Sequence, residues 1–414
     1  MIILKTLLFF LGFSSLFTLP VYHGFRIYHL FLILSFTTSI FFIFIKKISI
    51  TKNELFFFLL WVVYYALTMI GSVISQAYFG ILSSQLFIIT LLTVFLSYKI
   101  DKKNIFFFLK GFIYSAAFTG LFNIIDYIYF INHKKALISV LFPKNLLGEN
   151  LEHPLTNLTH IGNNIFYRAS GFSWDPGLTI TGLALAFIMI NENLVALKKM
   201  SKYILSVLIL IGIILSISKT AIITLIIYFI LKLIFHKDLH VLYKRNMYIS
   251  ALSIVFISII IFLLYIGLFV QYNSSLEGYI RHLKYFSSIF YYGNQDILHI
   301  LFGYGYVGVG KFFNEHVDWL YNVPGFYFGK NLCPESTLTN IFFWGGLMGA
   351  IIWIITFLNT LLSSNKSFKL LLIAIVLLMF GYNINTMWFN YIFFSVVLLH
   401  ANNFLKRVKY ENIY

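Results

Sequence analysis

Long apolar runs recur along almost the whole of this 414-residue chain. Each run is about 17–25 residues long, which is the length of an α-helix that crosses a hydrocarbon layer of roughly 30 Å. Backbone N–H and C=O groups find no water in lipid, so a spanning chain must form helices or a closed barrel. The runs are continuous rather than alternating, which favours helices. The sequence therefore predicts an all-α, polytopic integral membrane protein.

About twelve spans can be placed along residues 1–414, with no internal repeat and no low-complexity linker. Their expected cores are 4–20, 28–45, 54–72, 77–97, 104–131, 177–197, 202–217, 220–235, 248–270, 336–360, 367–381 and 386–405. The first run has no small-residue cleavage site and is followed at once by another span, so we expect an uncleaved helix. We expect a single transmembrane helical domain.

Lysine and arginine are concentrated in every second connection between the expected spans. The formal net charge is +16, which in a soluble protein would suggest a nucleic-acid partner. In a multi-pass membrane protein, basic connections mark the cytoplasmic side instead. The pattern places both termini in the cytoplasm and the two long connections, 132–176 and 271–335, outside. We expect 271–335 to be the long periplasmic loop and no nucleic acid to bind.

The loop 271–335 contains a glycine-rich segment, Phe302-Gly-Tyr-Gly-Tyr-Val-Gly-Val-Gly310. It lacks the Lys-Ser/Thr of a Walker loop, so we expect its glycines to let the backbone turn close to a ligand or another helix. The outer acidic residues include no Asp-x-Asp pair, and the histidines include no i,i+4 pair of a zinc site. Cys333 is the only cysteine, which excludes an internal disulfide. The sequence predicts neither a metal nor a cofactor.

Three outer cations are expected where a loop meets the membrane: Arg168, Lys219 and Arg281. Arg168 precedes the sixth span, Lys219 follows Ser216-Ile-Ser218 in a short turn between two brief spans, and Arg281 lies early in the long loop. A charge buried at membrane depth is costly and is usually functional. The alternatives are a lipid-headgroup anchor for Arg168, a snorkelling side chain for Lys219 and a solvated charge for Arg281.

Two carboxylates and two aromatic residues complete the candidate site: Asp175, Glu335, Trp174 and Tyr304. Asp175 precedes a proline, as a helix N-cap does, and Glu335 suits the positive end of a helix dipole. Capping is therefore the structural alternative for both carboxylates. Beside Arg and Lys, Glu335 is also a candidate base. Trp174 and Tyr304 are candidates for stacking on sugars, with packing as the alternative in a chain that is 20% aromatic.

Outward-facing cations at the membrane surface suit a phosphate-bearing lipid substrate. Arginine binds phosphate oxygens in a forked geometry, and lysine adds a point charge. The nearby carboxylate of Glu335 would accept a proton. Together these residue types indicate chemistry on a lipid-linked phosphate, without a metal.

The order of these pieces resembles the O-antigen polymerase (Wzy-type) and O-antigen ligase superfamily, over essentially the whole chain. The matching pieces are Arg168-x-x-Gly171 with Asp175-Pro176, Ser216-x-Ser218-Lys219-Thr220, Arg281, Phe302-Gly-Tyr-Gly305, and Glu335-Ser336 followed by Gly346-x-x-Gly349. The resemblance implies a GT-C-like polymerase/ligase architecture in the bacterial inner membrane. Ligases carry a histidine followed by Asn, Ser or Gln where this chain has Glu335-Ser336, so the glutamate favours the polymerase branch. An arginine is common where Lys219 stands.

The resemblance implies glycosyl transfer at the periplasmic face. The donor would be an undecaprenyl-pyrophosphate-linked oligosaccharide, and the acceptor the terminal sugar of another lipid-linked repeat unit. Glu335 would take the acceptor's proton, while Arg281, Lys219 and Arg168 would neutralise the leaving pyrophosphate. Beyond this substrate, the implied partners are membrane lipids and a chain-length regulator protein.

Two other functions stay open at this point. An O-antigen ligase would transfer the glycan to lipid A-core. A non-enzymatic transporter of lipid-linked glycan would place charges near the bilayer midplane and would often show inverted repeats. Asp126 and Glu192 are expected near span ends and no repeat is found, which disfavours the transporter.

Overall fold

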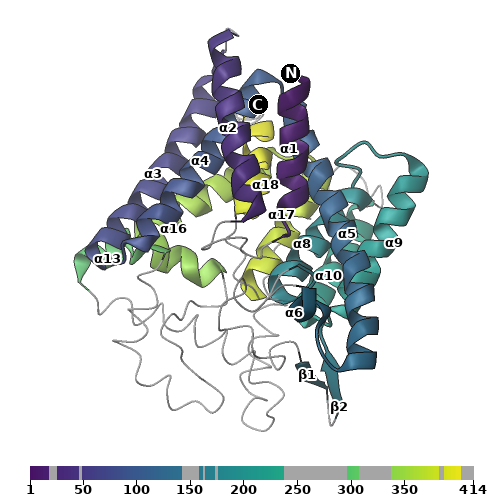
Figure 1. Cartoon of the computed structure of the whole chain (residues 1–414). Helices are drawn as coiled ribbons and strands as arrows, with labels where there is room; N and C mark the ends of the chain where they lie inside the picture. The colour runs from purple at the N-terminus through teal and green to yellow at the C-terminus, as the bar shows by residue number, and fades with distance from the viewer. Residues whose placement is uncertain are drawn as a thin grey trace.

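The computed structural model describes residues 1–17, 26–45, 49–141, 158–161, 164–172, 176–236, 296–306, 337–381 and 387–401. This part of the chain is mostly helical (Figure 1). Its helices are α1 (Ile2–Ser14), α2 (Ile27–Ile45), α3 (Lys52–Ile74), α4 (Phe79–Ile100), α5 (Asn104–His133), α6 (Leu137–Leu141), α8 (Pro176–Asn191), α9 (Lys199–Leu215), α10 (Lys219–His236), α13 (Ile297–Phe302), α16 (Thr337–Ser363), α17 (Lys366–Gly381) and α18 (Met387–His400).

A small antiparallel sheet is the one departure from the all-α prediction among the described residues. β1 (Leu158–Ile161) pairs with β2 (Asn164–Tyr167), with Thr159 opposite Phe166. The hairpin lies in the expected outer connection 132–176. Its strands are too short to give a readable alternating pattern, so the sequence did not predict it.

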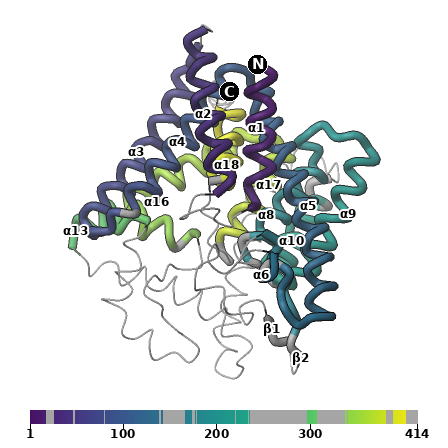
Figure 2. The backbone as a smooth tube through the Cα atoms, viewed as in Figure 1, coloured from purple at the N-terminus to yellow at the C-terminus, as the bar shows by residue number. Residues whose placement is uncertain are grey.

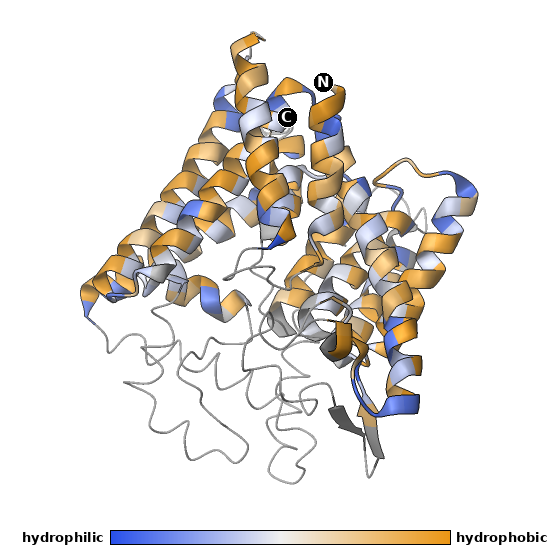
Figure 3. Cartoon of the chain, viewed as in Figure 1, coloured by the Kyte–Doolittle hydropathy of each residue, from blue (hydrophilic) through white to orange (hydrophobic). Residues whose placement is uncertain are grey.

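A helix lies at each expected span that falls within the described residues, whereas the expected span 248–270 lies outside them. In the part of the chain that the structure describes, five helices are long and apolar enough to cross a membrane: Ile27–Ile45, Lys52–Ile74, Gly80–Ile100, Asn104–His133 and Asn340–Ser363. Their outer faces are apolar (Figure 3); on α2, for example, Phe41 is 63% exposed and Phe44 is 86% exposed. Such faces need lipid around them, as expected for a membrane-embedded protein.

α5 is the central helix of one half of the bundle, where it packs against α1, α8 and α9 (Figure 2). Glycines make the contacts close. A Cβ on Gly12 of α1 would overlap the backbone of α5, and a Cβ on Gly111 of α5 would overlap the backbone of α1. A Cβ on Gly212 of α9 would lie only 2.7 Å from the Cα of Gly120. Small residues of this kind let membrane helices gain van der Waals contact along their backbones.

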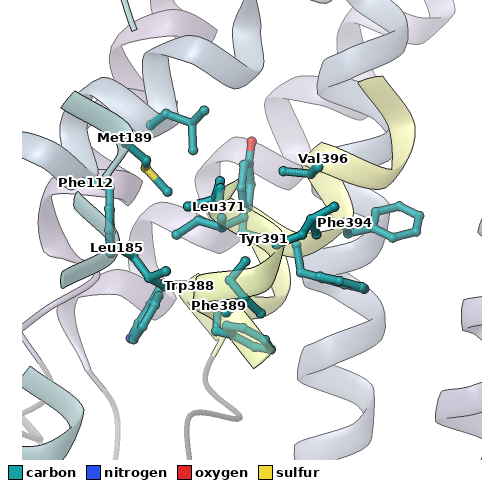
Figure 4. Packing of buried hydrophobic residues seen from close by; sticks show 14 of the residues in the cluster. Phe112, Leu185, Met189, Leu371, Trp388, Phe389, Tyr391, Phe394 and Val396 are labelled. Atoms are coloured by element: carbon teal, nitrogen blue, oxygen red, sulfur yellow. The ribbon is translucent and has the colours of Figure 1, made fainter. Parts of the chain in front are cut away.

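α18 fills the centre of the bundle with aromatic and aliphatic side chains (Figure 4). The ring of Tyr391 stacks on Phe108 of α5 with centroids 3.7 Å apart, and Trp388 lies against Phe112 at 5.2 Å. Both α18 residues are less than 5% exposed. This packing ties α18 to α5 and so holds the core together.

Three ion pairs gather the basic connections at one end of the bundle. Lys99 Nζ lies 2.7 Å from Glu54 Oε2, and Lys232 Nζ lies 2.9 Å from Glu192 Oε1. The third and longest pair joins Lys5 to Asp101, the residue at the end of α4, at 3.8 Å. The start of α1 and the end of α18 lie at this same end, and the β-hairpin lies at the other (Figure 1).

The Glu192 carboxylate is held by two partners, and its side chain is only 7% exposed. The hydroxyl of Tyr228 donates to its Oε1 at 2.6 Å, and Lys232 Nζ lies 2.9 Å from the same oxygen. This ion pair joins the end of α8 to the end of α10.

The pair of Lys99 and Glu54 is the most deeply buried of the three ion pairs, with side chains 8% and 1% exposed. Lys99→Met would leave the Glu54 carboxylate buried without a counter-ion, and we expect it to lower the free energy of unfolding by about 3–5 kcal/mol. Unfolding of the purified protein in detergent with increasing SDS measures this. The matched control is Lys103→Met, at an exposed lysine nearby; equal unfolding midpoints for the two variants would contradict the expectation.

Candidate functional site

A polar stripe runs along the buried face of α5 and leads to the end of the bundle that carries the hairpin. Ser115, Thr119, Asn123 and Asp126 are all fully buried. Their spacing brings them to one face, because residues three or four apart on a helix lie above one another. Buried polar side chains in an apolar bundle are costly, so the stripe marks this face of α5 as a site of interest.

Asp126 fixes the hairpin to α5. Its Oδ2 accepts a hydrogen bond of 2.6 Å from the hydroxyl of Tyr167, the last residue of β2. Its Oδ1 accepts one of 2.7 Å from the backbone N–H of Leu137 in α6. The ring of Tyr167 also stacks on Phe130 with centroids 3.9 Å apart. The chain therefore leaves β2 from a fixed point, and the next residue is Arg168.

Arg168 contacts the turn between α9 and α10. Its Nε donates to the carbonyl oxygen of Ser216 at 3.3 Å, and the next backbone N–H, that of Ala169, donates to the carbonyl oxygen of Leu215 at 3.2 Å. These contacts tie Arg168 to the turn from two directions. The side chain of Arg168 is half-buried.

Lys219 is the first residue of α10 and follows this turn directly. The hydroxyl oxygen of Ser218, the residue before α10, accepts a hydrogen bond of 3.3 Å from the N–H of Ala221 in the first turn of that helix. Ile217 has a φ of 43°, in the left-handed region that a β-branched residue rarely adopts. The side chain of Lys219 lies outside the described part, but its backbone stands beside the residues that hold Arg168. Two of the cations predicted from the sequence thus belong to one region.

The arrangement has the electrostatics of an anion site. The α10 dipole adds partial positive charge where the turn ends, and an arginine held by Nε keeps a fork of two further nitrogens. Gly171 closes the segment, with a φ of 62° and no room for a side chain: a Cβ there would lie 2.5 Å from Cγ2 of Thr119. Within the described residues, no cluster of three His, Cys, Asp or Glu side chains offers a metal site.

The remaining predicted site residues are placed differently. Glu335, Arg281, Asp175 and Trp174 lie outside the described residues. Tyr304 is only 5% exposed, and its ring stacks on His299 with centroids 4.1 Å apart. The burial of this ring fits the packing alternative for Tyr304, and its stacking on a sugar stays a prediction.

The prediction for the glycine-rich segment is confirmed where the structure describes it. Gly303 and Gly305 have φ values of 78° and 69°, and they press against the backbones of α16 and α3. A Cβ on Gly71 of α3 would lie 2.7 Å from the N of Gly305. Gly346 has a φ of 62° at the kink of α16, and a Cβ there would lie 2.7 Å from the N of Gly303. These glycines therefore serve helix packing.

Asp296, His299 and Ser75 form a second polar cluster, which the sequence analysis missed. Asp296 Oδ2 lies 2.6 Å from Nδ1 of His299, and Nε2 of that ring lies 3.4 Å from Oγ of Ser75. Hydrogen bonds from the backbone and the ring of His299 lower the pKa of the Asp296 carboxyl. The backbone N–H groups of Gln76 and Ala77 already donate to carbonyls of α3, so they are not free to stabilise an oxyanion. The cluster joins α13 to α3.

Tyr167→Phe tests whether the hairpin is fixed through Asp126. The change removes the only O–H from the ring and leaves a buried carboxylate oxygen without that donor, so we expect the free energy of unfolding to fall by about 1–3 kcal/mol. SDS unfolding in detergent measures it. Tyr129→Phe, on the same end of α5 but with its ring against His133, is the control; a loss no larger for Tyr167→Phe than for this control would refute the role of Asp126.

No model of a known protein family matches the chain, and no curated protein is similar enough in sequence to be counted as a relative.

Proposed function

We propose that the protein is a metal-independent glycosyltransferase of the bacterial inner membrane that polymerises O-antigen repeat units. Its substrate would be an undecaprenyl-pyrophosphate-linked oligosaccharide, joined at the periplasmic face. The proposal rests on the resemblance of the sequence to O-antigen polymerases. It includes the expected architecture of about twelve spans with both termini in the cytoplasm.

The distribution of charge supports this orientation. Lys5, Lys99 and Lys232 all lie in ion pairs at the end of the bundle that holds the start of α1. The β-hairpin lies at the opposite end (Figure 1), and Arg168 directly follows its second strand. If the basic end is cytoplasmic, Arg168 and the α9–α10 turn face the periplasm, where lipid-linked repeat units are joined.

The observation that carries the proposal is the contact between Arg168 and the turn that precedes Lys219. A hydrogen bond of 3.3 Å from Nε to the Ser216 carbonyl brings a forked cation to the first residue of α10. Pyrophosphate needs several positive groups that are in place before the bond breaks. Two cations from distant parts of the chain, beside the positive end of a helix, supply such a site.

The proposed reaction moves one glycosidic bond. The carboxylate of Glu335 takes the proton of an acceptor sugar hydroxyl, and the hydroxyl oxygen attacks the anomeric carbon of the donor. The bond from that carbon to the pyrophosphate oxygen breaks, and the electron pair leaves with the lipid pyrophosphate. Arg281, Lys219 and Arg168 neutralise this leaving group. Trp174 and Asp175 would contact the glycan beside Arg168.

Single substitutions in these residues are expected to stop chain growth while the protein still inserts. In cells that lack the native copy, Glu335→Ala and Arg281→Ala should leave surface polysaccharide one repeat unit long. Arg168→Ala should slow extension of the polysaccharide chain by about 10²–10³-fold, which is the usual cost of removing one preorganised group that stabilises developing charge. The length ladder on a gel reads out the result, with immunoblotting to check the amount of protein in the membrane.

Lys135→Ala, at an exposed lysine beyond the end of α5, is the control and should give the full ladder. A normal ladder from Glu335→Ala or Arg281→Ala would contradict the mechanism. Deletion of the gene separates the polymerase from a ligase: loss of a polymerase leaves a single unit on the lipid A-core, and loss of a ligase leaves none.

A further inference from the structure

We infer that Asn123 is a positioning residue that sets the place of the Arg168 guanidinium through the α9–α10 turn. The inference rests on the proposed function, because it assigns Arg168 a part in binding the pyrophosphate. Asn123 lies on α5 and is fully buried. It does not touch Arg168 in any described contact, so its influence would pass through Ser216.

Asn123 and Arg168 bond to the same residue from different sides. Nδ2 of Asn123 donates to the hydroxyl oxygen of Ser216 at 3.2 Å, and Nε of Arg168 donates to the carbonyl oxygen of Ser216 at 3.3 Å. Nδ2 also lies 3.3 Å from the carbonyl oxygen of Gly212, to which the Ser216 hydroxyl donates at 2.9 Å. One amide therefore holds both the end of α9 and the residue that anchors the arginine.

The backbone contact of α5 with α9 makes this reach possible. Gly120 and Gly212 bring the helices so close that a Cβ on Gly212 would lie 2.7 Å from the Cα of Gly120. Asn123 follows Gly120 by about one helical turn, so its short side chain meets the last turn of α9. If the two helices lay farther apart, the Ser216 hydroxyl would be too far from the Asn123 amide for a hydrogen bond.

The other half of the amide points to the segment that carries Arg168. Oδ1 of Asn123 is buried and has no hydrogen-bond partner among the described residues. A Cβ on Gly171 would lie 3.2 Å from this oxygen, so the oxygen adjoins the chain that follows Arg168. A half-satisfied amide costs stability in an apolar bundle, and packing alone would favour leucine at this position. Asn123 is thus better explained by the turn that it holds.

The expected consequence is a loss of rate that depends on Arg168. Hydrogen-bond partners that orient metal-binding side chains cost about 10–100-fold in affinity or activity when they are removed, and we expect the same scale here because a small misplacement of a charged group weakens transition-state stabilisation. Asn123→Leu should therefore slow transfer by about 10–100-fold. In an Arg168→Lys background, where Nε and the fork are gone, the same change should cost less than about twofold, because there is no guanidinium left to misplace.

The test is a double-mutant cycle on the full-length protein in lipid nanodiscs. The variants are Asn123→Leu, Arg168→Lys and the pair, and the readout is the rate of transfer from a lipid-pyrophosphate-linked oligosaccharide. Ser216→Ala is a second, milder way to break the contact between Asn123 and Ser216, since it removes the hydroxyl that accepts from Asn123 and keeps the carbonyl that accepts from Arg168. Asn132→Leu, at an exposed asparagine on α5 whose amide donates to the carbonyl oxygen of Ile128 in the same helix, is the control and should leave the rate unchanged. SDS unfolding midpoints show whether each variant is folded.

The inference predicts strong coupling: Asn123→Leu slows transfer in the wild-type background but has almost no effect in the Arg168→Lys background. If Asn123→Leu does not fold, Ser216→Ala takes its place in the cycle with the same expected result. It is overturned if the fold-changes multiply, as for a purely structural residue, or if neither variant changes the rate. Failure of the proposed function has another outcome. If the wild type transfers no glycan, or if Arg168→Lys is fully active, that function or the role of Arg168 in it is contradicted. If no glycan is transferred, the same variants are compared by their Kd for inorganic pyrophosphate. The inference then predicts that Asn123→Leu weakens binding in the wild-type background and not in the Arg168→Lys background, and equal weakening in both backgrounds overturns it.

Discussion

The close contacts of α5 with its neighbours are the constraint on which the rest of this structure depends. Gly111 lets α5 lie against the backbone of α1, and Gly120 lets it lie against α9. In lipid there is little hydrophobic gain when apolar helices associate, so such contacts must supply the attraction. The same approach brings the polar stripe of α5 within hydrogen-bond distance of other elements. Asp126 reaches the hairpin, and Asn123 reaches the end of α9.

These two contacts explain how the flexible side chain of Arg168 is held in place. Arg168 is preceded by Tyr167, which is bonded to Asp126, and followed by Ala169, which is bonded to Leu215. The guanidinium itself is anchored on Ser216. A cation that is fixed before the substrate arrives loses little entropy on binding and needs little reorganisation as charge develops. The strained backbone at Ile217 lies in this same turn and fits a turn whose shape is imposed by its neighbours.

The helices could be predicted from the sequence because apolar runs of the right length fix both type and position, as the 30-residue helix α5 illustrates. From the sequence, Arg168 and Lys219 could be grouped only as cations expected where a loop meets the membrane, and the contact of Arg168 with the turn before Lys219 is known from the structure. The hairpin and its anchor could not be predicted, since Asp126 and Tyr167 are far apart in the chain and a single buried carboxylate has no sequence signature for its partner. Asp296 and His299 stand three apart, which is a readable signal, but Ser75 becomes their neighbour only in the folded chain.

The central claim is that the end of the bundle with the β-hairpin and Arg168 catalyses transfer between lipid-linked glycans without a metal. The most direct measurement follows the wild-type protein in nanodiscs with a lipid-pyrophosphate-linked oligosaccharide, in the presence of EDTA. The account predicts products that lengthen by whole repeat units, with one lipid pyrophosphate released for each unit added. A donor that keeps its length, or growth that stops when EDTA is added, would contradict it.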